Sequence, residues 1–128
     1  MHKKIVSTTK APAPVGPYSQ AVWAGNLLFL SGQIAIDPAT GDMVLDDIEA
    51  ETHQVMKNID AVLKEAGLSF ENIVKTSIFL DDMNDFSRVN VVYGSYFNAD
   101  TAPARECVEV AKLPKGVNVE ISVIAFAE

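Results

Sequence analysis

The C-terminal segment 117–127 constrains the fold more than any other stretch, because both faces of the strand that it predicts carry apolar residues. Its even positions begin polar but end with Ile124 and Phe126. A strand face that meets water stays polar along its whole length. We therefore expect helices on one face and another subunit on the other. The first face holds the odd positions, which are all apolar with the period of a strand: Val117, Val119, Ile121, Val123 and Ala125.

Two amphipathic helices are expected to cover the first face. Asp46 with Glu49 three residues later predicts the N-terminal cap of the first helix, and Gly67 is expected to end it. Charged residues such as Glu51 are assigned to its solvent side. Its apolar side has three- and four-residue spacing and holds Ile48, Val55, Met56, Ile59, Val62, Leu63 and Ala66. The second helix follows the acidic residues 81–85, and its apolar side holds Phe86, Val89, Val92, Tyr93, Tyr96 and Phe97.

The other strands follow from composition. The proline-rich segment 11–17 forms a rigid loop, since its three prolines fix φ and remove backbone donors. A hairpin turning at Gly25-Asn26 comes next, and its second strand is apolar on both faces. The expected strands are 3–8, 22–24, 27–31, 73–80, 105–111 and 117–127. Two helices cannot cover both faces of such a sheet, so the predicted class is α+β with helices on one face and an oligomer contact on the other.

Length and charge narrow the function classes. The 128 residues fit one domain, 1–128, and the net charge of −7 argues against a nucleic-acid partner. A single cysteine is consistent with a reducing compartment. Neither a signal-like N-terminus nor an apolar run of about 18 residues is found, so a soluble cytoplasmic protein without a membrane partner is expected. No phosphate loop, dinucleotide fingerprint or metal-site spacing occurs, so neither cofactor nor metal is expected.

Arg105 is the first candidate functional residue. It is one of only two arginines, and it begins an apolar, strand-like stretch. A guanidinium there needs an anionic partner, and its planar fork suits a carboxylate. Glu120 lies in the next predicted strand, and if the two strands pair, both side chains point into one cleft. Glu120 then either orients a water beside an anion held by Arg105, or is itself the ion-pair partner of Arg105; the two readings stay open on these residues alone.

Two further residues carry alternatives. Cys107 is a candidate nucleophile, but the two histidines, His2 and His53, are distant in sequence, which favours a buried thiol. Tyr18 follows the proline loop and is either the cap of a pocket or a packed surface aromatic. Gly32, at the end of a predicted strand, indicates a bulge or a close approach to the backbone.

Seven ordered motifs resemble the Rid/YjgF family. The similarity runs from about residue 5 to the C-terminus and is closest to the RidA branch, the 2-iminobutanoate/2-iminopropanoate deaminases. The motifs are Gly16-Pro17-Tyr18-Ser19-Gln20-Ala21, Ser31-Gly32-Gln33-Ile34, Pro38-x-Thr40-Gly41, Asn58-Ile59 with Ala66-Gly67-Leu68, Leu80-x-x-Met83-Asn84-Asp85-Phe86, Pro103-Ala104-Arg105-x-Cys107-Val108-x-Val110, and Leu113-Pro114-Lys115.

The resemblance implies a chorismate-mutase-like fold, with two helices on one face of a mixed sheet. It also implies a homotrimer whose free sheet faces form a central barrel, with clefts between subunits. Arg105 would grip the substrate carboxylate, Glu120 would lie near the water, and Cys107 would act through its backbone. Tyr18, Ser31 and Gly32 would line the pocket, and Asn90 would lie at its periphery.

The implied reaction is hydrolysis of 2-imino acids, formed after the dehydration of serine or threonine, to 2-keto acids and ammonia. It needs neither a cofactor nor a covalent intermediate. The alternative is a non-catalytic trimer that binds 2-keto acids or other small carboxylates. A reading as an endoribonuclease or translation inhibitor fits poorly with the acidic charge. The familiar RidA pattern often has Ser where this chain has Glu106, which is expected to face away from the cleft if strand alternation holds.

Overall fold

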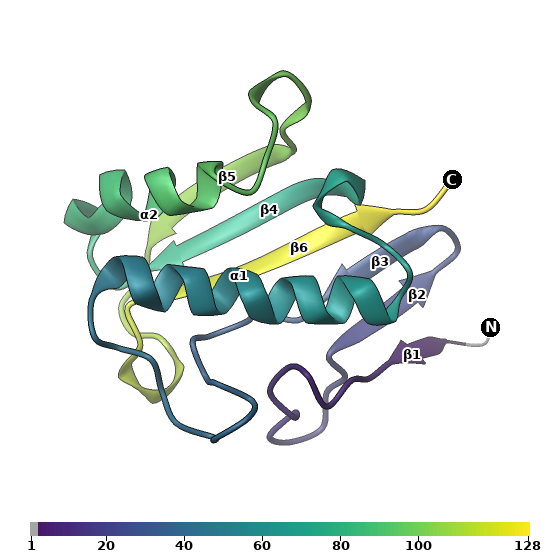
Figure 1. Ribbon diagram of the computed structural model, residues 1–128, viewed down its shortest axis with the longest axis horizontal. Helices are drawn as coiled ribbons and strands as arrows, with labels where there is room; N and C mark the ends of the chain where they lie inside the picture. The colour runs from purple at the N-terminus through teal and green to yellow at the C-terminus, as the bar shows by residue number, and fades with distance from the viewer. Residues whose placement is uncertain (1–2) are drawn as a thin grey trace.

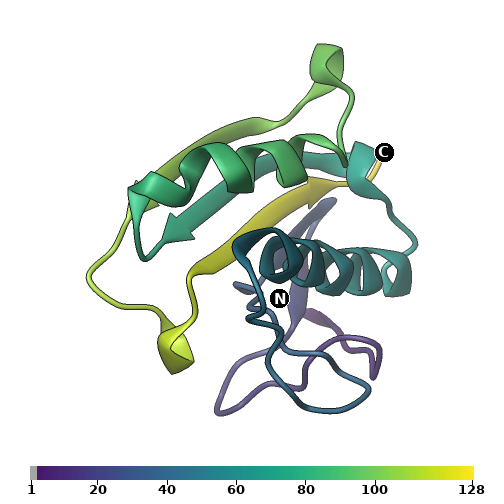
Figure 2. The ribbon, with the colours of Figure 1, turned by 60° about the vertical axis from the view of Figure 1, so that its left-hand side comes forward.

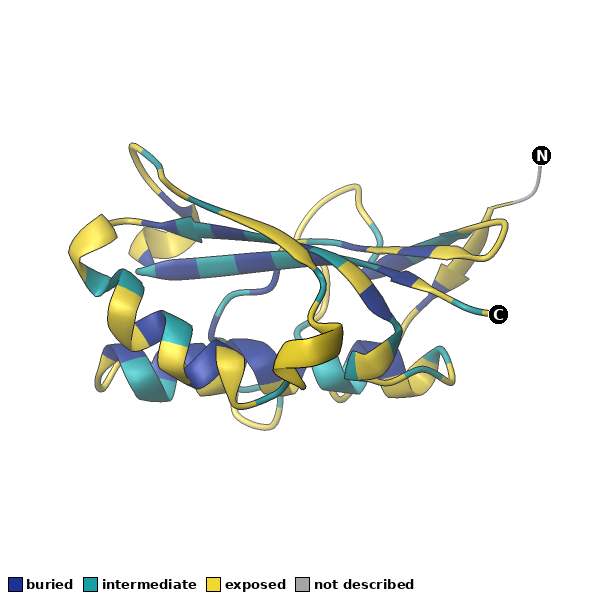
Figure 3. Cartoon of the chain, turned by 90° about the horizontal axis from the view of Figure 1, so that it is seen from above, coloured by how far each residue is buried: buried dark blue, intermediate teal, exposed yellow. Residues whose placement is uncertain are grey.

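The computed structural model describes residues 3–128, which form a six-stranded mixed sheet with two helices on one face (Figures 1 and 3). The strand order is β1-β2-β3-β6-β4-β5. Only β4 and β5 pair in parallel; every other neighbouring pair is antiparallel. The strands are β1 Lys4–Val6, β2 Ala21–Ala24, β3 Leu27–Leu30, β4 Ile73–Leu80, β5 Ala104–Glu109 and β6 Val119–Phe126. The helices are α1 Ile48–Glu65 and α2 Phe86–Gly94, and short 3-10 turns include η3 Ala99–Thr101 and η4 Pro114–Gly116.

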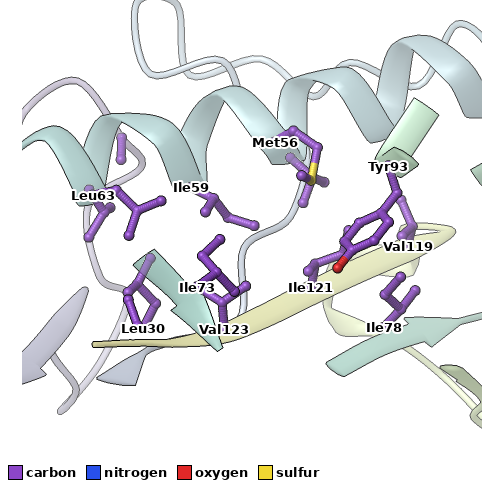
Figure 4. Close-up of a cluster of buried hydrophobic side chains, with 14 of the residues drawn as sticks. Leu30, Met56, Ile59, Leu63, Ile73, Ile78, Tyr93, Val119, Ile121 and Val123 are labelled. Atoms are coloured by element: carbon purple, nitrogen blue, oxygen red, sulfur yellow. The ribbon is translucent and has the colours of Figure 1, made fainter. Parts of the chain in front are cut away.

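The core lies between the sheet and the two helices (Figure 4). The predicted alternation of the last strand is confirmed, since Val119, Ile121, Val123 and Ala125 are all buried beneath the helices. Their partners from α1 include Met56, Ile59 and Leu63, shown with Tyr93 of α2 in Figure 4. The last two expected strands are each shorter than predicted. The turn η4, in which Lys115 has φ 57°, occupies the chain between them.

The opposite side of the sheet, which we call the open face, is not covered by either helix of residues 3–128 (Figure 3). Leu27 and Phe29 of β3 lie there opposite Phe126 and Ile124 of β6. Phe29 is 42% exposed and Phe126 is 39% exposed. These values are high for large apolar side chains on one continuous surface. Cover of the open face by another subunit therefore stays a prediction.

The first helix begins one residue later than predicted. Asp47, not Asp46, is the N-cap, and its side chain accepts a hydrogen bond of 2.7 Å from the Ala50 backbone N–H. Its extended backbone (φ −153°, ψ 169°) is the conformation that an N-cap requires. The predicted end is correct, because Ala66 closes the helix and Gly67 follows with φ 78°.

This cap supports a stability prediction with a matched control. Replacing Asp47 by Ala should lower the free energy of unfolding by about 1 kcal/mol, since one backbone donor of the first turn loses its partner. Replacing the adjacent Asp46 by Ala should change it by less than about 0.5 kcal/mol. Urea unfolding curves of both variants measure the difference, and equal losses would contradict the assignment of the cap.

One predicted surface residue is in the core. Glu51 of α1, assigned to the solvent side because it is charged, is fully buried. It lies three residues after the buried Ile48, so helical geometry places it on the apolar side despite its charge. Within residues 3–128, neither α1 nor α2 is long and apolar enough to cross a membrane.

Candidate functional site

A pocket of about 550 Å³ opens between the proline-rich loop, the end of β3, the turn η4 and β6. Four residues predicted for the site line it: Tyr18, Ser31, Gly32 and Glu120. Lys115 also lines it, and most of the remaining wall is apolar, with Pro12, Ala13, Val15, Ile34, Ile36 and Pro114. The residues that the resemblance assigned to one pocket are thus brought together, with the exception of Arg105, Cys107 and Asn90.

The floor of the pocket is built where β3 ends and the chain turns along β6. Gln33 and Ile121 exchange two backbone hydrogen bonds, of 2.8 and 3.1 Å. The Ser31 hydroxyl donates to the Ser19 carbonyl at 2.6 Å. These bonds hold Gly32 against Glu120 so closely that a Cβ on Gly32 would lie 2.9 Å from Glu120 Cδ. The close approach predicted at Gly32 is therefore made to the Glu120 carboxylate.

Glu120 is half-buried on the open face, and burial raises the pKa of its carboxyl above the usual value. Within residues 3–128 it has no side-chain hydrogen bond and no ion pair. A carboxylate that is partly desolvated and has no protein partner is available to a water or a ligand, and it binds protons more readily than a surface glutamate.

Gln20 shapes the other wall of the pocket, and sequence reasoning did not single it out. The side chain is buried, and its Nε2 donates to the carbonyls of Thr8 at 3.0 Å and Pro12 at 2.9 Å. Its Oε1 accepts from the Thr8 N–H at 2.7 Å. These bonds clamp the proline-rich loop, and Tyr18 Oη accepts from the Val15 N–H at 3.2 Å at its tip. The sequence held one sign of this role: Gln20 directly precedes an apolar strand, and a polar side chain buried there needs hydrogen-bond partners.

Arg105 lies elsewhere, on the helix side of the edge strand β5. Its Nη1 donates to Asn90 Oδ1 at 2.7 Å, and its guanidinium stacks over the rings of Tyr93 and Phe86, with the centroids at 5.2 and 5.7 Å. All three partners belong to α2. Among the described residues no carboxylate pairs with it. Asn90, expected at the periphery, is thus a direct partner of the guanidinium.

The last two strands do not pair, so the condition for a cleft shared by Arg105 and Glu120 within one chain is not met. β4 lies between β5 and β6, with Thr76 opposite Arg105 and Phe79 opposite Glu120. Residues 76 and 79 are an odd number apart, so Arg105 faces the helices and Glu120 faces the open side. The cause is the helix α2, which carries the chain across to add β5 parallel to β4 at the sheet edge. Within one chain the two residues therefore neither share a cleft nor form an ion pair.

Cys107 is not arranged as a nucleophile. It faces the helices two residues after Arg105, and burial raises the pKa of its thiol, which the charge of Arg105 only partly offsets. His53 Nδ1 is hydrogen-bonded to Tyr96 Oη at 2.8 Å, and His2 lies outside the described residues. Across residues 3–128, no three His, Cys, Asp or Glu side chains gather as metal ligands would.

Glu106 faces away from Arg105, as strand alternation predicts. On the open face it pairs with Lys75 Nζ at 2.8 Å and accepts a hydrogen bond from the Ser77 hydroxyl. These bonds, from Lys75 and then Ser77, hold the pKa of its carboxyl below the usual value. The extra carboxylate is thus neutralised by its own neighbours and lies on the other side of the sheet from the guanidinium.

Comparison with known proteins identifies the family. The sequence profile of the family described as Endoribonuclease L-PSP matches residues 8–127. The crystal structure of a Rid-family protein of Yersinia pestis superposes with a TM-score of 0.95 at 52% identity, covering 98% of this chain and 100% of that chain. The chain belongs to the Rid/YjgF family. The predicted fold class is confirmed for the Rid fold: a mixed sheet with two helices on one face.

Relatives in the Rid family have differing names. A RutC family protein of Synechocystis is 56% identical over 126 residues, which are 98% of this chain and 97% of the relative. A protein of Mus musculus is 48% identical over 123 residues, covering 96% of this chain and 90% of the relative. The mouse protein is named 2-iminobutanoate/2-iminopropanoate deaminase. Membership of the family is therefore shown, and the activity of this chain is the subject of a proposal.

Proposed function

We propose that this Rid-family protein hydrolyses small 2-imino acids, such as 2-iminobutanoate and 2-iminopropanoate, to 2-keto acids and ammonia. The observation that carries the proposal is the pair of complementary half-sites. Arg105, oriented by Asn90 and without a carboxylate partner, can bind an anion. Glu120, partly desolvated in a mostly apolar pocket, can accept and donate a proton. The name of the mouse relative supports this reaction.

The assembly follows from the positions of the two half-sites. Because they lie on opposite faces of one sheet, a neighbouring copy is needed to bring Arg105 of one chain to Glu120 of another. The exposed apolar residues of the open face, Phe29, Val108 and Phe126, supply a surface for that contact. We propose a homotrimer, in which three open faces pack around a common axis and three sites form between subunits.

The chemistry needs only groups of the protein and water. Arg105 binds the substrate carboxylate through two parallel hydrogen bonds, while Asn90 and two aromatic rings keep the guanidinium in place. Ionised Glu120 orients a water and accepts its proton as the oxygen adds to C2 of the imine. Glu120 passes that proton to nitrogen, which completes the carbinolamine. Glu120 then takes the hydroxyl proton and delivers it to nitrogen, so that the C2–N bond breaks, the C2=O bond forms and ammonia leaves. Backbone groups near Cys107 and Gly32 bind the imino nitrogen.

The required acceleration is modest, because free imines already hydrolyse in water. Binding of the substrate carboxylate orients the imine for attack. A single general base then raises the rate by about 100- to 10,000-fold. This is consistent with a site that has a positioned arginine and one carboxylate but no activated thiol: the pKa of Cys107 is raised by burial.

The deciding assay generates 2-iminobutanoate from threonine with a dehydratase and follows the release of 2-ketobutyrate. The protein should accelerate the release at micromolar concentration. An unchanged rate would refute the enzymatic proposal. Calorimetry with 2-ketobutyrate in the same experiment then tests the alternative, a binding protein that holds 2-keto acids without turnover.

Gly32 provides a prediction about the geometry of the pocket. Replacing Gly32 by Ala places a methyl group within contact of the Glu120 carboxylate, so the flexible end of Glu120 must move. We expect kcat to fall by about tenfold, a barrier increase near 1.4 kcal/mol, with little change in the urea midpoint. Gly94→Ala is the matched control, since the added Cβ meets nothing within 4 Å apart from its neighbouring residues and the backbone of its own helix. Equal kcat values for the two variants would contradict the placement of Glu120.

A further inference from the structure

The fully buried Glu51 of α1 is bonded only to donors at the start of β6. Its Oε2 accepts from the backbone N–H groups of Asn118 at 2.7 Å and Val119 at 3.1 Å. Its Oε1 accepts from Asn118 Nδ2 at 2.8 Å. No Lys or Arg within residues 3–128 pairs with it. Figure 2 shows the first turn of α1 beside β6.

Packing alone does not explain why a carboxylate occupies this position. Burial of a charge without a counter-ion is costly, and the space could be filled by an apolar side chain of similar shape. Three hydrogen bonds and the positive end of α1 offset that cost. In return, the two backbone donors at 118 and 119 have fixed partners. The Asn118 carbonyl accepts from the Asp81 N–H at 3.0 Å, so this residue is held from two elements.

Asn118 and Val119, the two residues that Glu51 holds, lie between two parts of the pocket. The turn η4 before them contributes Lys115 to the pocket wall, and Glu120 follows Val119 directly. The Cδ and Oε2 atoms of Glu120 lie 2.9 and 3.0 Å from the position that a Gly32 Cβ would occupy. Glu120 is the second residue of β6 and lies opposite Phe79 of β4. The bonds from Glu51 add a hold on the two residues directly before it, from the helix side of the sheet.

We propose that Glu51 is a positioning residue for Glu120. It fixes residues 118–119 from the helix side, so that the Glu120 carboxylate stays against Gly32 on the open face. The kinetic part of this inference rests on the proposed function, whereas the structural part does not.

Two substitutions at Glu51 distinguish the effect of its hydrogen bonds from the effect of its packing. Glu51→Leu removes both acceptor oxygens, and with them all three hydrogen bonds, and replaces the carboxylate by an apolar side chain of similar size. Glu51→Gln can keep all three bonds: its carbonyl accepts from the two backbone donors, and its amide donates to Asn118 once the Asn118 amide turns over. Asn118→Ala removes only the side-chain bond at 2.8 Å and provides a milder variant.

The first measurement follows Glu120 itself, without any substrate. A ¹³C-carboxyl NMR titration reports its ionisation, and Lys115 and Tyr18 are the other titratable groups that line the same pocket. In Glu51→Leu, water reaches the loosened pocket, so the Glu120 titration should move toward lower pH and the 118 and 119 amides should exchange faster. In Glu51→Gln, both properties should match the unsubstituted protein.

The second measurement is the kinetic split in the imine assay. Glu51→Leu should lower kcat by about tenfold with KM changed by less than about twofold, since Arg105 lies on the other side of the sheet. Glu51→Gln should restore kcat. Loss of stability in Glu51→Leu with unchanged kcat and an unchanged Glu120 titration would overturn the proposal.

The outcomes remain distinguishable if one arm fails. If Glu51→Leu does not fold, Asn118→Ala must shift the Glu120 titration in the same direction, and an unchanged titration overturns the proposal. If the unsubstituted protein has no deaminase activity, the proposed function fails, while the titration and amide exchange still decide whether Glu51 positions Glu120.

Discussion

Replacing Arg105 by Ala is expected to lower kcat/KM for 2-iminobutanoate by at least about a hundredfold, because the substrate carboxylate loses a charge-assisted, two-point contact. The structure shows a guanidinium that the protein already holds in one orientation. Asn90 Oδ1 accepts from Nη1 at 2.7 Å, and Tyr93 and Phe86 lie beneath the guanidinium plane. The remaining donors are thereby left for a ligand. The coupled dehydratase assay measures the loss.

Two controls make this result specific. Arg105→Lys keeps the charge but lacks the planar fork, so it should recover only part of the lost activity. Arg88→Ala removes the other arginine of the chain, whose partner is Glu49 on α1, and should leave kcat/KM within about twofold. Full activity in Arg105→Ala would refute the role of Arg105 as the carboxylate-binding residue.

Replacing Glu120 by Gln is expected to lower kcat by about a hundredfold, since a neutral amide cannot accept the proton of the attacking water. The pH dependence gives a second signature. Burial raises the pKa of Glu120, so kcat should rise with pH through that raised value in the unsubstituted protein and stay low and flat in the variant. A pH profile that is identical in both proteins would exclude Glu120 as the base.

The raised pKa also sets the sign of a stability effect. Protonated Glu120 is favoured in the folded state, so its contribution to stability is present below the ordinary glutamate pKa and is lost as pH rises through the raised value. At neutral pH, Glu120→Gln removes a partly desolvated charge and should be at least as stable as the unsubstituted protein. Thermal unfolding at two pH values measures this, and it separates lost chemistry from lost folding.

A mixing experiment tests whether each site uses two chains. The Arg105→Ala and Glu120→Gln proteins, each expected to have little activity, are unfolded together and refolded at equal ratio. If every site takes Arg105 from one chain and Glu120 from another, random assembly restores about a quarter of the full activity. No recovery from well-formed mixed trimers would show that both residues of a site come from the same chain.

The sequence predicted those features that depend on neighbouring residues. The hairpin at Gly25-Asn26, strand β4 and the end of α1 at Gly67 were predicted correctly, because turn chemistry and periodicity act over a few residues. The order of the strands depends on how α2 carries the chain over the sheet, which no local pattern records. Whether the last two strands pair was therefore left as a condition, and the structure shows that it is not met, because β4 lies between β5 and β6.

Glu51 shows a different reason for failure. Its spacing from Ile48 placed it on the apolar side of α1, but its charge suggested solvent. The spacing was the better guide, since the donors of Asn118 and Val119, distant in sequence, compensate the buried carboxylate. Asn90 was underestimated for a similar reason: its importance lies in one bond to Arg105 that only the fold reveals.

The placement of Arg105 and Glu120 on opposite faces of one sheet has a consequence for how the protein responds to dilution. A single chain would hold two halves of different sites and no whole one, so the proposed catalyst is the assembly. Specific activity should then fall as protein is diluted below the dissociation constant of the trimer, without any chain unfolding. The apolar open face would in this way make the amount of protein a control on its activity.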